Sequence, residues 1–133
     1  MSLAYVDASA LVKLIAEEPE SDALALFLGS AEPLASSILV TVEVARAVSR
    51  GARHLGGRVT QVLDGVNMIE FNARIAARAA VVRPPTLRML DAIHLASAIE
   101  LGDELTAFVC YDERLSAAAR DLGLPVVSPH DEG

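Results

Sequence analysis

The stretch Ala4-Tyr5-Val6-Asp7-Ala8-Ser9-Ala10-Leu11-Val12 decides the fold class, because a short apolar run ends in an acid and leads straight into a helix-like apolar segment. Such a run predicts a buried strand of an α/β sheet. In open parallel sheets, ligands bind at the edge where the strands end. Asp7 is therefore a candidate site residue, and polar groups at the ends of neighbouring strands become candidates as well.

Size and composition are typical of one domain. The chain has 133 residues, of which 53% are hydrophobic, so we expect a single domain over residues 1–133 with one core. The single cysteine, Cys110, excludes an intramolecular disulfide. The N-terminus has no basic lead-in, and no apolar run reaches the roughly 18 residues of a membrane span. These features predict a cytoplasmic protein that does not associate with membranes.

Strand and helix patterns alternate along the chain. We expect strands at 3–6, 34–36, 66–71, 107–111 and 125–127. We expect helices at 8–16, 21–28, 38–53, 59–63, 73–82, 89–101 and 113–122, with a break at Gly56-Gly57. Alternation of this kind predicts βαβ units, and hence an α/β fold with a parallel sheet covered by helices on both faces.

Charge is distributed unevenly. The net charge of −7 argues against nucleic-acid binding by bulk charge, yet residues 46–88 hold 8 of the 11 Lys and Arg and only 2 of the 18 acids. This arginine-rich middle could face phosphate or an acidic protein segment, although solvated helix faces explain it more simply. The arginines of interest are Arg46, Arg50, Arg53, Arg74, Arg78, Arg83 and Arg88.

Two acids follow apolar strands. Asp7 ends the first expected strand, and Asp112 follows the apolar run 108–111. Each also precedes an expected helix, and Asp is a preferred N-cap residue, so capping alone explains either one. Ser9 has the same simple interpretation.

Two more acids lie on apolar helices. Glu43 lies in segment 38–45, which is apolar on almost every side and therefore predicts a buried helix. A buried carboxylate is costly unless it binds a metal or forms an ion pair, here with Arg46 or Arg50, and the two explanations are balanced. Asp91 lies in the first turn of an apolar helix, where capping or the helix dipole explains it. His94, one turn on, is interpreted as a core residue, with metal ligation as the alternative.

Taken together, the four acids indicate a metal site. Strand ends and adjacent helix starts converge on one edge of a doubly wound sheet. Carboxylates gathered there repel one another unless a cation lies between them, and an all-oxygen set suits Mg²⁺ or Mn²⁺. Such ions support phosphodiester hydrolysis. Zinc is disfavoured, because His54, His94 and His130 lack ligand spacing and Cys110 is solitary.

Four stretches resemble the PIN-domain ribonucleases, and among them the VapC-type toxins of toxin–antitoxin pairs. They are Tyr5-Val6-Asp7-Ala8-Ser9-Ala10, Thr41-Val42-Glu43-Val44-Ala45-Arg46, Leu90-Asp91-Ala92-Ile93-His94-Leu95-Ala96-Ser97-Ala98 and Tyr111-Asp112-Glu113-Arg114-Leu115. Their order and spacing fit the family across nearly the whole chain. The strings Asp-Ala-Ile-His-Leu-Ala and Tyr-Asp-Glu-Arg-Leu are the most specific.

The resemblance implies a five-stranded parallel sheet and a site in which Asp7, Glu43, Asp91 and Asp112 bind Mg²⁺ or Mn²⁺. It also implies cleavage of RNA, with tRNA or ribosomal RNA as the target, a homodimer, and neutralisation by a VapB-type antitoxin in a larger assembly. The Ser9 hydroxyl is implied to help shape the metal site. The family commonly has threonine where this chain has Cys110. Because a thiol is a poorer hydrogen-bond partner, we expect weaker orientation of Asp112.

Other classes fit less well. A haloacid-dehalogenase-type phosphatase needs a second aspartate two residues after the first, where this chain has Ser9. A phosphoacceptor receiver domain needs a lysine after a late strand, and the only lysine is Lys13. The serious alternative is a catalytically silent PIN scaffold that binds RNA or a protein partner.

Overall fold

A five-stranded parallel sheet forms the centre of the computed structural model, which describes residues 1–29 and 33–130. The strands are β1 (Leu3–Val6), β2 (Leu34–Ser37), β3 (Val66–Ile69), β4 (Leu105–Val109) and β5 (Val126–Val127), in the order β3-β2-β1-β4-β5. All neighbouring strands pair in parallel. The chain builds outward from β1 to β3 and then returns to place β4 on the other side of β1. The strand order thus reverses between the neighbouring strands β1 and β4, which makes their carboxyl ends the switch point of the sheet.

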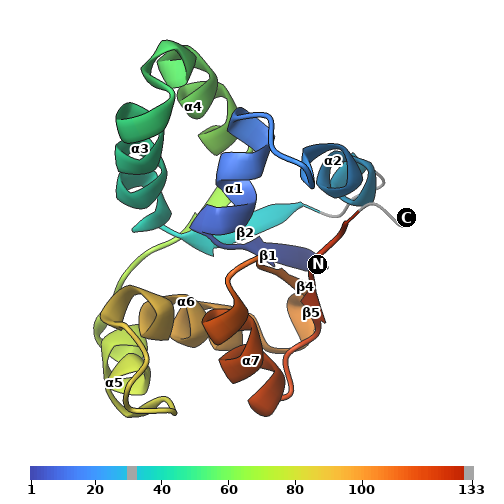
Figure 1. The fold of residues 1–133 in the computed structure, drawn as a ribbon. Coiled ribbons are helices and arrows are strands. Elements are labelled where there is room, and N and C mark those ends of the chain that lie inside the picture. The colour runs from blue at the N-terminus through green and yellow to red at the C-terminus, as the bar shows by residue number, and fades with distance from the viewer. Residues whose placement is uncertain (30–32, 131–133) are drawn as a thin grey trace.

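Helices cover both faces of this sheet (Figure 1). One face carries α1 (Ala8–Ile15), α2 (Ser21–Gly29), α3 (Val40–Gly51) and α4 (Gly56–Leu63). The other face carries α5 (Ala73–Val81), α6 (Met89–Glu100) and α7 (Glu113–Asp121). Short 3₁₀ turns occur at Arg53–Leu55 and Gly102–Glu104. The predicted fold class, a parallel five-stranded sheet flanked by helices on both faces, is confirmed.

Alternation along the central strands divides the core into two layers. Ala4 and Val6 of β1 pack into the apolar cluster under α1, α3 and α4. Tyr5 points to the opposite face, where its ring stacks on Phe108 with centroids 5.3 Å apart. The middle of α6 is buried on every side from Ala92 to Ala98. These contacts fix the height of α6 against the end of β1.

Two local predictions need correction. Gly56 and Gly57 do not form a break between helices. They are the first two residues of α4, which therefore starts three residues before its predicted boundary. Segment 38–45 is not buried on all sides: α3 begins at Val40 and buries only the stripe Val40, Val44 and Val48. Val42 is 57% exposed, because a helix packed on one side of a sheet buries only residues about four apart.

The strands are also placed slightly differently from their predicted positions. β3 ends at Ile69, and β4 runs over residues 105–109, two residues before its predicted range. Within residues 1–29 and 33–130, the structure has no helix long and apolar enough to cross a bilayer.

Candidate active site

All four predicted acids line one pocket of about 340 Å³ at the carboxyl edge of the sheet. Asp7 follows β1, and Asp112 lies three residues beyond β4, so these two flank the point where the strand order reverses. Glu43 reaches the pocket from α3, and Asp91 reaches it from the first turn of α6. Both helix layers and the sheet therefore contribute to the pocket.

Asp7 is the most firmly held of the four. Its side chain is the N-cap of α1 and accepts hydrogen bonds at Oδ1 from the Ala10 amide (3.0 Å) and from the Ser9 hydroxyl (2.7 Å). Ser9 in turn accepts a hydrogen bond from the Tyr111 amide at 3.0 Å. Burial raises the pKa of Asp7 above its ordinary value, and these hydrogen bonds oppose that rise only in part. Capping and site formation are thus performed by the same side chain.

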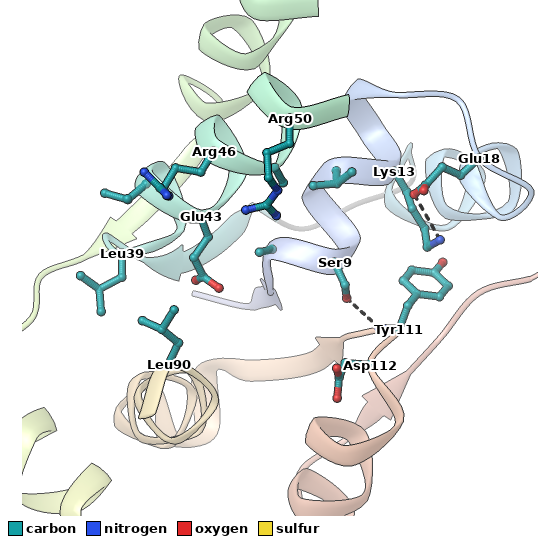
Figure 2. Close-up of a pocket in the computed structure, with 14 residues that line it drawn as sticks. Ser9, Lys13, Glu18, Leu39, Glu43, Arg46, Arg50, Leu90, Tyr111 and Asp112 are labelled. Atoms are coloured by element: carbon teal, nitrogen blue, oxygen red, sulfur yellow. Dashed lines mark hydrogen bonds and ion pairs between the residues drawn. The ribbon is translucent and has the colours of Figure 1, made fainter. Parts of the chain in front are cut away.

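Glu43 is paired with His94. Oε1 of Glu43 lies 2.7 Å from Nε2 of His94, and Nδ1 of that ring lies 2.6 Å from the Tyr5 hydroxyl. No ion pair joins Glu43 to Arg46 or Arg50 within the described part of the chain, so that alternative is wrong. Both arginines line the wider groove beside α3 instead, where Figure 2 shows them on the α3 side.

Asp91 and Asp112 lie close enough to influence each other. Burial first, and then the charge of Asp112, raises the pKa of Asp91. Asp112 is the N-cap of α7 and accepts at Oδ1 from the Leu115 amide at 2.9 Å. The exposed Arg88 guanidinium lies 3.8 Å from Asp91 and 3.9 Å from Asp112, and so provides a positive charge between two acids.

Cys110 acts on a different acid from the one expected. Its thiol donates to Oδ2 of Asp7 at 3.2 Å and contacts the backbone oxygen, not the carboxylate, of Asp112. Burial raises the pKa of the thiol to about 12, so it stays a neutral donor. The Asp112 carboxylate is oriented by its capping bond instead, which needs no side chain at residue 110.

A larger groove of about 780 Å³ adjoins the acidic pocket between α1 and α3 (Figure 2). Glu43, Ser9 and Asp112 line both cavities, so the two are continuous. The groove has apolar walls, including Val12 and Leu39, and carries Arg46 and Arg50 on its α3 side. Lys13 also lines the groove but is ion-paired with Glu18 and Glu20. The α3 side is therefore the part of the groove that matches a negatively charged chain.

The pocket suits a hard divalent cation by its chemistry. Its donors are carboxylate oxygens, and Arg88 already supplies a positive charge between two of them. Among residues 1–29 and 33–130, no three His, Cys, Asp or Glu side chains already converge as metal ligands do. Ion binding therefore requires the pocket side chains to draw closer, which the partly exposed Asp112 allows.

Two residues that support the pocket from behind were not predicted. Tyr5 reaches His94, and Ser37 donates its amide to the Tyr5 hydroxyl at 3.1 Å. Arg88, one of the arginines of interest in the sequence, reaches two of the acids. A tyrosine within a buried strand was the available signal for Tyr5, because its hydroxyl needs a partner there. Nothing in the sequence singles out Ser37, since its role depends on the pairing of β1 with β2.

The PIN-domain family model matches residues 4–121. Ribonuclease VapC47 of Mycobacterium tuberculosis is 42% identical over 130 residues, covering 94% of this chain and 96% of its own. Ribonuclease VapC35 of the same species is 45% identical over 129 residues, with the same coverage. Among solved structures, a toxin–antitoxin complex from Klebsiella pneumoniae aligns with a TM-score of 0.72 at 26% identity, covering 97% of this chain and 99% of that one. Mycobacterium tuberculosis VapC20, described as a sarcin-ricin loop cleaving toxin, shares the fold with a TM-score of 0.76 at 19% identity, covering 95% of this chain and 99% of that one.

The fold, which carries this acidic pocket at its switch point, is that of a PIN domain. The full-length match to curated relatives is more specific: this chain belongs to the PIN-domain family, among its VapC-type ribonucleases.

Proposed function

We propose that this protein is a metal-dependent endoribonuclease toxin that hydrolyses phosphodiester bonds of tRNA or ribosomal RNA in the cytoplasm. Asp7, Glu43, Asp91 and Asp112 would hold Mg²⁺ or Mn²⁺. The observation that carries the proposal is the meeting of four carboxylates, from four separate segments, in one pocket at the switch point of the sheet. Acids this close are unfavourable without a cation, and phosphodiester hydrolysis is the chemistry that such an ion supports.

The bound ion would lower the pKa of a water molecule and neutralise charge on the leaving oxygen. The chain's own residues prepare the site for this. Ser9, Cys110 and the Ala10 amide hold Asp7 in one orientation. Arg88 is exposed beside Asp91 and Asp112, where its guanidinium can contact a phosphate of the substrate.

The test is cleavage of total RNA by purified protein free of antitoxin, in Mg²⁺, Mn²⁺ or EDTA, with fragment ends mapped by sequencing. We expect discrete cuts that require metal, and Asp91→Asn should reduce cleavage at least about 100-fold, since loss of a residue that only supports a ligand already costs 10–100-fold. Asp103→Asn is the matched control, because Asp103 is exposed at the opposite edge of the sheet.

A catalytically silent scaffold is the competing function. It predicts RNA or protein binding without metal-dependent turnover. Normal cleavage by Asp91→Asn would refute the proposed site, whereas absence of cleavage by folded, metal-loaded protein would favour the scaffold.

The proposal includes partners. We propose a homodimer neutralised by a VapB-type antitoxin, in agreement with the toxin–antitoxin complex among the structural relatives. The groove beside α3, with its apolar walls and arginines, would suit an acidic antitoxin segment. Light scattering on the toxin alone and with its antitoxin tests both assemblies, and a monomer in both samples would contradict them.

A further inference from the structure

A buried hydrogen-bond chain runs from β2 through β1 and α6 to the acidic pocket. The Ser37 amide lies 3.1 Å from the Tyr5 hydroxyl, Tyr5 lies 2.6 Å from Nδ1 of His94, and Nε2 of His94 lies 2.7 Å from Oε1 of Glu43. Tyr5 is 0% exposed and His94 is 2% exposed. Water therefore does not compete for the inner bonds of this chain.

The donor and the acceptor in each bond of this chain follow from the Ser37 amide, where the chain begins. A backbone amide only donates, so the Tyr5 oxygen accepts from Ser37 and has its own proton left to donate. The nearest acceptor is Nδ1 of His94, which selects the tautomer with the proton on Nε2. That N–H then points at Glu43 and donates to Oε1.

We propose that Tyr5 and His94 are positioning residues that fix the Glu43 carboxylate by one oxygen and keep the other available to the divalent ion. The inference rests on the proposed function and extends it to residues that touch neither ion nor RNA. Within residues 1–29 and 33–130, Oε2 of Glu43 has no hydrogen-bond partner.

The other acids show why Glu43 needs this support. Asp7 and Asp112 are short side chains anchored by the amides at the starts of α1 and α7. Glu43 has one more rotatable bond and lies at the end of the first turn of α3, a helix whose N-cap residue, Leu39, makes no side-chain capping bond. His94 supplies the missing anchor across the sheet, from the layer opposite α3 (Figure 1).

The first measurement is made on the unmodified protein. A long-range ¹H–¹⁵N spectrum of metal-free protein at neutral pH should show His94 as the Nε2–H tautomer. An Nδ1–H tautomer would overturn the proposal, because that ring could not donate to Glu43.

The second measurement is Mn²⁺ affinity, obtained by titration calorimetry with MnCl₂. Tyr5→Phe keeps the ring that stacks on Phe108 and removes only the hydroxyl, and it should weaken Mn²⁺ binding about 3-fold to 10-fold. His94→Leu should weaken it about 10-fold to 100-fold. His94→Gln should recover part of that loss, because its amide can again donate to Glu43. RNA cleavage should lose kcat with little change in KM.

Ser97→Ala is the matched control, since it removes a buried hydroxyl from α6 without touching Glu43. Folded Tyr5→Phe and His94→Leu proteins that bind Mn²⁺ within twofold of the parent would overturn the proposal. If the parent binds no Mn²⁺, or if Asp91→Asn binds it equally well, the metal site itself is wrong and both proposals fall. Loss of affinity in Asp91→Asn alone would leave the proposed function standing and remove the role of Tyr5 and His94.

Discussion

At the scale of single residues, the acids of the pocket have two functions at once. Asp7 and Asp112 each cap a helix through Oδ1, and each also faces the pocket. The capping bonds cost the site little, because a carboxylate has about four lone-pair positions and the cap uses one. The simple capping interpretation and the functional one are therefore compatible for these two residues.

The raised pKa values of Asp7 and Asp91 predict how the metal-free protein responds to pH. Because burial raises the pKa of Asp91 in the folded state above the unfolded value of about 3.9, the folded state binds more protons there. The contribution of Asp91 to stability should therefore fall as the pH rises from about 4 through the folded pKa. In EDTA at pH 7, Asp91→Asn should melt at a higher temperature than the parent.

Calorimetric melting from pH 4 to pH 8 measures this effect. Saturating Mn²⁺ should reverse the order of the two proteins, because the ion stabilises only the form that binds it. Asp103→Asn again controls for the change in charge. A parent that melts above Asp91→Asn at pH 7 in EDTA would contradict the prediction.

At the scale of elements, α6 supports the site more than any other helix. Asp91 lies in its first turn, His94 follows one turn later, and Ala92 to Ala98 are all buried. The deep burial of α6 also destabilises the protein at one position, because the hydroxyl of Ser97 is buried with no hydrogen-bond partner in the described residues. A buried unsatisfied polar group is destabilising.

Ser97→Ala should therefore stabilise the protein. Removing the unpaired hydroxyl and introducing a better helix former should raise the free energy of unfolding by about 1 kcal/mol, measured by urea denaturation. Ser116→Ala on α7 is the comparison, because the Ser116 hydroxyl donates to the Cys110 carbonyl, and its loss should lower stability. A Ser97→Ala protein less stable than the parent would show that the hydroxyl has a partner.

At the scale of the whole molecule, the arginine-rich middle of the chain is divided among several surfaces. Arg46 and Arg50 line the groove that joins the acidic pocket, and Arg88 lies over the acids. Arg74 and Arg78 of α5 pair instead with Glu100 of α6, and both helices lie on the face of the sheet opposite α3. Only part of the predicted basic patch thus borders the groove and the acidic pocket.

Charge reversal separates these groups. Arg46→Glu with Arg50→Glu should weaken RNA binding and flatten its salt dependence by about 0.7 in log–log slope for each RNA phosphate that the variant no longer neutralises. Fluorescence anisotropy with Asp91→Asn as background measures binding without cleavage. Arg83→Glu, exposed in the loop after α5, is the control. If the double variant binds RNA and antitoxin as tightly as the background protein, Arg46 and Arg50 contact neither partner and are solvated surface residues.

Much of the architecture was predictable because it depends on local pattern. Apolar runs that end in acids located β1 and β4, and alternation of strands with helices predicted the parallel sheet covered on both faces. The predictions of burial and of helix boundaries were wrong where these depend on contacts with other parts of the chain. The exposure of Val42 depends on what packs against α3, and the helical start at Gly56 depends on the turn before it.

By itself, the sequence determined the α/β class and the order of the elements and singled out the four acids as candidates, because hydrophobic periodicity and the residues at strand ends are local properties. Only the tertiary structure decided which side chains meet. The pairing of Glu43 with His94, the bond from Cys110 to Asp7 and the position of Arg88 join segments up to 103 residues apart. Such contacts depend on strand order and on the depth at which each helix packs, and neither is encoded in a local pattern of residues.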